Sequence, residues 1–339
     1  MVPGVQTIMR RESASLVRSS EQAAPFDVLA DVLRGLQLRS RVHGRYELRA
    51  PWGMKMECAS YPVFYAVTRG NCVLTVDGAD HALTGGDFVF ISPGRRFALR
   101  DRRETRAVPL VDIYAPRGLR CGGHLSYGGS GLETTMLVGS FSFEDTALSP
   151  LAHQLPVLLH VKNRSTAQAR WLESTLDLLA VELAARQPGY ETTVSRLADV
   201  LFVQALRAHV ESSSAHNGWL RALDDPRLGV VLQRIHETPE APWTMQSLSR
   251  LAGMSRSLFA ARFKRVVGDA PLTYLGKWRM HRAIQMMRDP GLSLGEIGRR
   301  VGYETESAFG KAFKRSLGAT PGQYRRTQEA SANERPQGA

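Results

Sequence analysis

The spacing of hydrophobic positions separates a β-rich region from the helical regions that follow it. Between residues 45 and 115, short apolar runs such as VFYAVT, CVLTVDG and DFVFIS are separated by Gly/Asp turns, which predicts a small antiparallel barrel or sandwich. The preceding segment, 26–40, has the pattern of a short amphipathic helix. Residues 117–131 contain six glycines and predict a loop.

The spacing becomes helical between about 150 and 215. In the segment 171–185, leucines recur at intervals of four, three and four residues, which places Leu172, Leu176, Leu179 and Leu183 on one face of a helix. A second helical stripe covers 194–210, and Gln187-Pro188-Gly189 separates the two. Such a hairpin buries its stripe either against the β region or against a second copy of itself, and the pattern is compatible with both.

A short motif occurs twice in the last third of the chain. FKRVVGDAPLTY (263–274) and FKRSLGATPGQY (313–324) share six residues at one offset. Upstream of each copy, a short helical pattern leads through Gly253-Met254 or Gly302-Tyr303 into a second helix. Glycine permits the sharp turn between the two helices, so each copy predicts a helix-turn-helix unit.

Within each predicted second helix, two phenylalanines at i and i+4 share one face and should point inward. The opposite face then carries small residues flanked by cations, which suits a helix lying in a DNA major groove. In the first copy these residues are Arg256, Ser257, Ala260, Ala261 and Lys264. In the second copy they are Thr305 as the cap, Glu306, Ser307, Gly310, Lys311 and Lys314.

Charge points to the same partner. The chain has a formal net charge of +12, and residues 226–326 contain 18 lysines and arginines against 7 aspartates and glutamates, so nearly all of the excess lies around the duplication. A basic domain on a neutral body indicates a polyanionic partner.

Between the two copies of the motif, about 18 helical residues would span roughly 27 Å. Such a rod would hold two helices about one DNA turn, ~34 Å, apart.

Residues 226–326 resemble the AraC/XylS family of bacterial transcription regulators, through the repeated units and the spacing F-K-R-x2-G-x2-P-x2-Y. The resemblance implies that the second helix of each unit touches bases in adjacent major grooves of double-stranded DNA. It also implies RNA polymerase as a partner. The family commonly has arginine where this chain has Ala261, whereas Lys311 keeps a cation in the second copy. Shape readout and phosphate contacts should therefore matter more in the first module.

The β region and the following helices resemble the cupin-type sensor half of one branch of this family, through RYELRAPWGM, GDFVFISPG and WLESTLDLLAVELA. This implies an α+β protein with a cupin-like β-barrel, a helical linker and dimerisation region that forms a homodimer, and an all-α double helix-turn-helix domain. The expected divisions are a flexible tail (1–25), sensor (26–135), linker (136–222), DNA-binding domain (223–326) and disordered tail (327–339). A small-molecule effector is the default signal, with a lining drawn from Tyr46, Trp52, Phe64 and Phe88.

The rival interpretation is a cupin-fold binding protein or metal enzyme whose basic helices serve assembly. A catalytic metal needs about three fixed ligands, but His81 is the single histidine between 45 and 120, and Tyr65 and Phe97 stand where related sensors often carry histidine. His43 and His124 flank the barrel without evident pairing. We therefore expect no metal, no cofactor and no enzymatic activity.

The three cysteines are too scattered for a disulfide framework, and no apolar stretch is long enough for a membrane span, so we expect a cytoplasmic protein. Some regulators with this type of sensor respond to reactive chlorine, which raises an oxidant-sensing hypothesis. Cys121, beside Arg120, is the best candidate thiol. Cys72 is expected in the core, and Cys58 follows an acidic residue.

Overall fold

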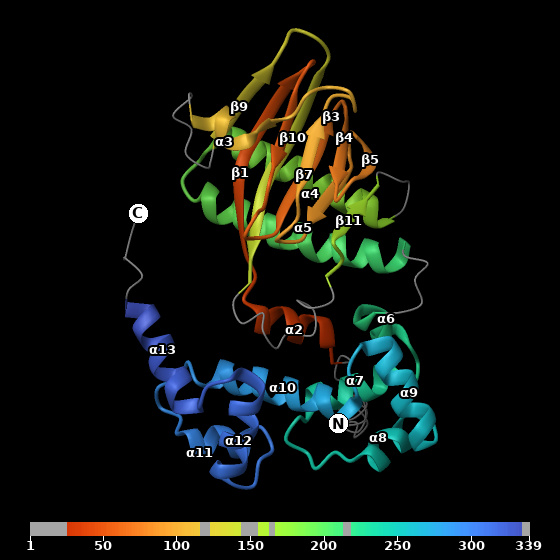
Figure 1. Cartoon of the computed structure of the whole chain (residues 1–339), viewed down its shortest axis with the longest axis vertical. Helices are drawn as coiled ribbons and strands as arrows, with labels where there is room; N and C mark the ends of the chain where they lie inside the picture. The colour runs from red at the N-terminus through yellow and green to blue at the C-terminus, as the bar shows by residue number, and fades with distance from the viewer. Residues whose placement is uncertain (1–25, 116–122, 144–154, 163–166, 213–217, 334–339) are drawn as a thin grey trace, which may run out of the picture.

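Two β-sheets and a cluster of short helices form the two ends of the molecule (Figure 1). The computed structural model describes residues 26–115, 123–143, 155–162, 167–212 and 218–333. We call residues 39–212 the sheet domain and residues 218–333 the helical domain. Helix α2 (Val28–Leu36) lies between them. No helix in these described ranges has the length and apolar character needed to cross a bilayer.

The sheet domain is a sandwich of a six-stranded and a five-stranded sheet. The first sheet has the order β11-β6-β3-β10-β1-β9, with bounds β11 Leu158–Val161, β6 Phe88–Ile91, β3 Val63–Arg69, β10 Glu133–Ser142, β1 Arg39–Arg49 and β9 Gly123–Gly128. The second has the order β5-β4-β7-β2-β8, with bounds β5 Ala79–Thr84, β4 Asn71–Val76, β7 Phe97–Arg100, β2 Gly53–Met56 and β8 Val108–Pro109. Helix α3 (Leu110–Tyr114) follows β8.

Alternation along the strands gives the first sheet two apolar faces. On β3, Tyr65 and Val67 face the core between the sheets, whereas Phe64 and Ala66 belong to the core on the other side. Helices α4 (Ala167–Ala185) and α5 (Tyr190–Ser212) cover that outer side. Leu172, Leu176 and Leu179 are buried in it, so most of the predicted leucine stripe is covered within the chain itself.

The side chains of strand β1 switch from one face of the sheet to the other in the middle of the strand, because of a β-bulge at His43. The pairing of β1 with β10 passes from Val42↔Gly139 to Gly44↔Val138, which leaves His43 without an opposite residue. Before the bulge, Val42 packs toward the helices, whereas Tyr46 and Leu48 beyond it lie between the sheets. Gly44 has φ +134°, and a Cβ atom there would meet the carbonyl oxygen of Gly123 on β9. One extra residue thus reverses the faces to which the side chains of the rest of the strand point.

The helical domain repeats one unit around a central helix. Helices α6 (Trp219–Asp224) and α7 (Leu228–Glu237) precede the first module, which consists of α8 (Met245–Leu251) and α9 (Arg256–Val267). Helix α10 (Pro271–Met286) leads to the second module, α11 (Leu294–Arg300) and α12 (Glu306–Leu317), and α13 (Pro321–Asn333) follows. In Figure 1 the two modules lie at opposite ends of α10.

The two modules agree in local detail as well as in order. The glycine between the helices has positive φ in both, +60° at Gly253 and +89° at Gly302, as the turn requires. Helices α8 and α11 both begin with a capping box, and Ser255 and Thr305 cap the second helices through their hydroxyl oxygens. The predicted helix-turn-helix units are therefore confirmed.

The repeated Phe and Tyr of the motif form the same aromatic pair in both copies. The rings of Phe263 and Tyr274 meet edge to face with centroids 5.8 Å apart, and those of Phe313 and Tyr324 do so at 5.5 Å. Both pairs join the second helix of a module to the helix that follows it. The spacing of the motif thus reflects the closure of each module by an aromatic contact.

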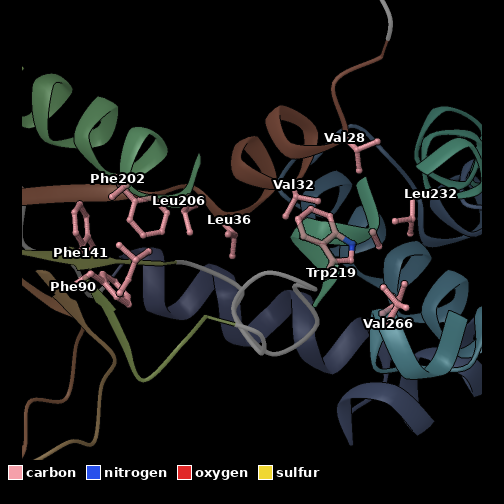
Figure 2. Close-up of a cluster of buried hydrophobic side chains, with 14 of the residues drawn as sticks. Val28, Val32, Leu36, Phe90, Phe141, Phe202, Leu206, Trp219, Leu232 and Val266 are labelled. Carbon is pink, nitrogen blue, oxygen red and sulfur yellow. The ribbon is translucent and has the colours of Figure 1, made fainter. Parts of the chain in front are cut away.

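A continuous apolar core connects the two domains through α2 (Figure 2). Phe90, Phe141 and Phe202 form its sheet-domain end, with the rings of Phe141 and Phe202 4.9 Å apart. Val28 and Val32 of α2 belong to the same core, which continues through Trp219 into the helical domain. The α2 helix begins at Asp27, whose carboxylate accepts a hydrogen bond from the backbone N–H of Ala30.

Three expectations about element limits differ from the structure. Part of the glycine-rich segment is strand β9, because β1 pairs with it in parallel and supplies its backbone partners. The sheet extends past residue 135, since β10 continues to Ser142 and β11 adds a further strand. Helix α13 reaches Asn333, beyond the expected start of the disordered tail at 327.

Candidate nucleic-acid interface

Helices α9 and α12 expose equivalent faces because their phenylalanines are buried. Phe259 and Phe263 of α9 have no exposed surface, and the same is true of Phe309 and Phe313 of α12. Each pair is also in ring contact, with centroids 5.5 Å apart in α9 and 5.6 Å apart in α12. With these faces fixed inward, the opposite faces of both helices are available to a partner.

The predicted DNA contacts of the first module lie on the open face of α9. The side chains of Arg256, Ser257, Ala261 and Lys264 are exposed, and Ala260 is half-buried among them. Ser255, which caps the helix, is exposed at its start. The face therefore has small side chains at its centre and cations at both ends, which allows close approach to a duplex.

The second module presents a matching face on α12. Glu306, Ser307, Lys311 and Lys314 are exposed, and no atom lies within 4 Å of a Cβ built on the half-buried Gly310. Exposed Thr305 accepts a hydrogen bond from the backbone N–H of Ala308 at 3.1 Å through its hydroxyl, so its side chain is held at the start of the helix. The structure thus brings each predicted set onto one helical face.

Three lysines on these faces have no acidic partner in the described part of the chain. Among the described residues, Lys264, Lys311 and Lys314 make no ion pair. By contrast, Arg262 on the side of α9 is 2.5 Å from a carboxylate oxygen of Asp225, and Lys277 is 2.8 Å from Asp269. The charges of the three lysines are therefore not offset by a neighbouring carboxylate, whereas those of Arg262 and Lys277 are.

Arg279 on α10 makes long-range contacts that sequence analysis missed. Its Nε donates to the carbonyl of Pro239 at 2.7 Å, and a terminal nitrogen donates to the carbonyl of Ala241 at 2.8 Å, both in the loop before the first module. Its guanidinium also lies 5.6 Å from the centre of the Tyr303 ring in the turn of the second module. Burial lowers the pKa of Arg279, an effect opposed by Tyr303 and Glu240. One side chain thus joins the loop before the first module to the turn of the second module.

The four residues expected to line an effector site are not brought together. Tyr46 and Trp52 are buried in the core between the sheets, and Phe64 and Phe88 are buried in the core under α4 and α5. The rings of Phe64 and Phe88 stack on one another with centroids 5.7 Å apart. The bulge in β1 and the alternation of β3 produce this separation, since they turn Tyr46 and Phe64 to opposite faces of the sheet.

The histidines named in the sequence lie in different places. His81 is on strand β5, and His124 on β9 has a partner, because its Nε2 is 3.3 Å from a carboxylate oxygen of Glu47. His43 occupies the bulge of β1. Tyr65 and Phe97 pack edge to face with ring centroids 5.8 Å apart. Within the described ranges, no group of three or more His, Cys, Asp or Glu side chains has the arrangement of a metal site.

The cysteines differ in their surroundings. Cys72 is buried, and this burial, with a smaller effect from Asp87, raises the pKa of its thiol to about 12. It therefore stays protonated and unreactive at neutral pH. Cys58 is exposed. Cys121 lies outside the described residues.

Comparison with known proteins assigns families to both halves. Residues 27–211 match a family of cupin domains, and residues 248–327 match a family of helix-turn-helix domains. A protein named as an AraC-like transcription regulator in Streptomyces lividans is 35% identical over 303 residues, which cover 88% of this chain and 98% of the relative. The HTH-type transcriptional regulator AlkR of Acinetobacter baylyi is 28% identical over 302 residues, covering 88% of this chain and 99% of the relative.

Among solved structures, the DNA-binding domain of AdpA in complex with a target DNA is similar to part of this chain. It is 32% identical, and the match covers 34% of this chain and 99% of that chain, with a TM-score of 0.30.

Proposed function

Because this chain belongs to the AraC family of transcription regulators, we propose that α9 and α12 are its two DNA-reading helices and that its cupin domain controls them. Its relatives of similar length carry the names of transcription regulators. The observation that supports the assignment is the pair of equivalent faces on α9 and α12, each with buried phenylalanines behind it and unpaired lysines on it.

The spacing of the two faces suits one side of a duplex. Helix α10 has 16 residues and is therefore ~24 Å long. Because the modules lie at its two ends, their reading helices suit two successive major grooves, ~34 Å apart. The contacts of Arg279 to the loop before the first module and to the turn of the second would hold that spacing.

Within each face we assign reading and clamping to different residues. Ser257 and Ala261 on α9, and Ser307 and Lys311 on α12, lie at the centre of the faces and would meet base edges. Lys264 and Lys314, one turn further along, would bind phosphates. Arg256, Ala260, Thr305, Glu306 and Gly310 complete the two contact surfaces.

We also propose a homodimer formed through the outer face of α4. Trp171, Leu178 and Val181 are spaced seven and three residues apart and therefore lie on one side of this helix, where 65%, 59% and 66% of their surfaces are exposed. The inner side of the same helix is already buried within the chain. A second copy meeting this stripe would cover an apolar surface that is open in one chain.

The remaining partners follow from the proposed role. A regulator that binds double-stranded DNA acts where the DNA lies, so we propose a cytoplasmic location and RNA polymerase as the machinery that it influences. A small-molecule effector would act through the cupin domain. Cys58 and Cys121 are the thiols left for an oxidant response, since the raised pKa of Cys72 makes that residue unsuitable.

The test begins with genomic footprinting of the full-length protein to identify its operator. Lys264→Ala and Lys314→Ala should weaken binding to operator and random DNA alike and reduce the slope of log affinity against log salt by about one each. Ser307→Ala and Lys311→Ala should instead change the preferred bases. Lys162→Ala, an exposed lysine of the sheet domain, is the control. Equal losses on operator and random DNA for all four variants would contradict the division between reading and clamping.

A further inference from the structure

A cavity of about 650 Å³ lies outside the sandwich, between strand β1 and the ends of α4 and α5 that meet at the hairpin. Its apolar wall consists of Leu137 on β10, Ala180 and Leu183 on α4, and Val194 on α5. The volume is in the range of sites for small organic ligands. The cavity is separate from the core that contains Tyr46 and Trp52, and it is on the opposite side of the first sheet.

The bulge residue His43 lines this cavity. Both of its ring nitrogens are shielded from solvent, and neither has a hydrogen-bond partner among the described residues. A buried polar group without a partner costs free energy, so such groups in native proteins usually meet a ligand or water. Burial, with a smaller effect from Arg41, lowers the pKa of His43, which keeps its ring neutral with one N–H to donate.

The charged groups around the cavity leave an excess of cations. Glu47 is occupied by two partners, since Arg45 lies 3.2 Å and His124 3.3 Å from its carboxylate oxygens. Glu191 accepts a hydrogen bond from the hydroxyl of Tyr190 at 3.2 Å. Arg41 and Arg186 also line the cavity, and in the described part of the chain neither has a carboxylate partner. The polar rim therefore favours a negatively charged group.

We propose that this cavity is the effector site and takes an organic anion with an apolar body. The anionic group would be held by the N–H of His43 and by Arg41 and Arg186, and the apolar body would lie against Leu137, Ala180 and Leu183. The assignment rests on the proposed function, since it locates the signal of that regulator. It also suggests how the signal travels, because the ligand would fill the space beneath α4, the helix whose outer stripe we assign to the dimer.

Two fluorescent probes that differ in one group test the proposal on the full-length protein without DNA. Anilinonaphthalene sulfonate carries an anionic group on an apolar body, and phenylnaphthylamine is the same body without it. The wild-type protein should bind the sulfonate at least about tenfold more tightly than the neutral probe, as a charge-assisted contact predicts. Arg41→Ala and His43→Ala should each remove most of that preference, while Arg170→Ala, an exposed arginine of α4 outside the cavity, should not.

Cavity-filling variants test the location independently of charge. Ala180→Trp and Ala184→Trp enter from two positions on α4, and both should abolish binding of either probe while cooperative unfolding is kept. Equal affinity of the wild type for both probes, or unchanged binding by both the filled and the Arg41→Ala variants, would overturn the proposal. Operator binding by the wild type and by the same variants is measured in a separate experiment. If the wild-type protein does not bind DNA, the proposed function is refuted, but the result with the probes still holds.

Discussion

Asp31 of helix α2 and His236 of helix α7 are 205 positions apart in the chain, and Oδ2 of Asp31 lies 3.1 Å from Nδ1 of His236. The other ring nitrogen of His236 is 2.8 Å from the hydroxyl of Tyr274, which also accepts the indole N–H of Trp219 at 2.6 Å. Burial is the main cause that lowers the pKa of His236, against the opposing effect of Asp31. A neutral ring that donates to Asp31 and accepts from Tyr274 satisfies every member of this network.

Removing the carboxylate of Asp31 should loosen the attachment of α2 to the helical domain. Asp31→Ala leaves Nδ1 of buried His236 without a hydrogen-bond partner and also removes a carboxylate 3.8 Å from Arg282. We therefore expect the free energy of unfolding to fall by about 2–4 kcal/mol. Urea unfolding measures this. Asp177→Ala, at an exposed position of α4, should change stability by less than about 0.5 kcal/mol. Similar decreases in the free energy of unfolding in both variants would show that the hydrogen bonds of Asp31 and His236 do not contribute to stability.

Stability should decrease as the pH falls through the range in which buried His281 stays neutral. Burial, helped by Arg282, lowers the pKa of His281 to about 4, whereas an unfolded histidine titrates near 6.5. Between these values the unfolded chain binds more protons, so the free energy of unfolding should fall by up to ~1.4 kcal/mol per pH unit as the pH drops from 6.5 towards 4. His281→Gln should reduce this slope, and His124→Gln, whose ring is 52% exposed, should not. An unchanged slope for His281→Gln would count against the burial effect.

Arg279 should set how strictly the two modules keep their spacing on DNA. Arg279→Lys keeps the charge but cannot donate to the carbonyls of Pro239 and Ala241 in the same fork while lying against Tyr303. We expect the variant to bind the operator about tenfold more weakly than the wild type. Inserting one base pair between the two contacted grooves should then reduce the affinity of the variant by a smaller factor than that of the wild type. Gel mobility shifts on both DNAs measure the two effects. Arg288→Lys, exposed near the end of α10, is the control. A variant that discriminates between the two DNAs as well as the wild type would exclude this role.

The exposed stripe on α4 predicts how the dimer can be broken. Leu178→Glu or Val181→Glu places a carboxylate where each copy would desolvate it, so the dimer should dissociate to monomer at micromolar concentration. Sedimentation velocity detects the change. Leu132→Glu is the matched control, because Leu132 is 89% exposed but lies in a turn of the sheet domain. Loss of the dimer in the control, or its survival in both stripe variants, would place the interface elsewhere.

The helical domain could be predicted in detail because the sequence patterns that determine its helices and turns are local and occur in two copies. The positions of Phe259, Gly253 and Pro271 define a helix face, a turn and a helix start, and each has a counterpart 49 or 50 residues later. Their roles depend on spacing within a few residues, which periodicity reveals. The predicted faces of α9 and α12 therefore appear in the structure with the same residues, all exposed except half-buried Ala260 and Gly310.

The sheet domain was less predictable because its geometry depends on pairing between distant strands. Nothing in the sequence RVHGRYEL shows that His43 is the extra residue in the pairing of β1 with β10. A shift of one residue reverses which side chains face the core, so Tyr46 and Phe64 were expected together and lie on opposite faces. The contacts of Asp31 and Arg279 were missed for the same reason, since their partners come from remote segments.

The position of α2 limits how this chain can be recombined with its relatives. A chimaera that joins residues 1–212 to a foreign helical domain would bring Val28, Val32 and Asp31 against a surface that did not arise with them. The foreign domain would in turn lose the side chains that cover its own equivalent of Trp219. Productive exchanges of sensory halves should therefore transfer the first helix together with the DNA-binding end, although the two are encoded at opposite ends of the gene.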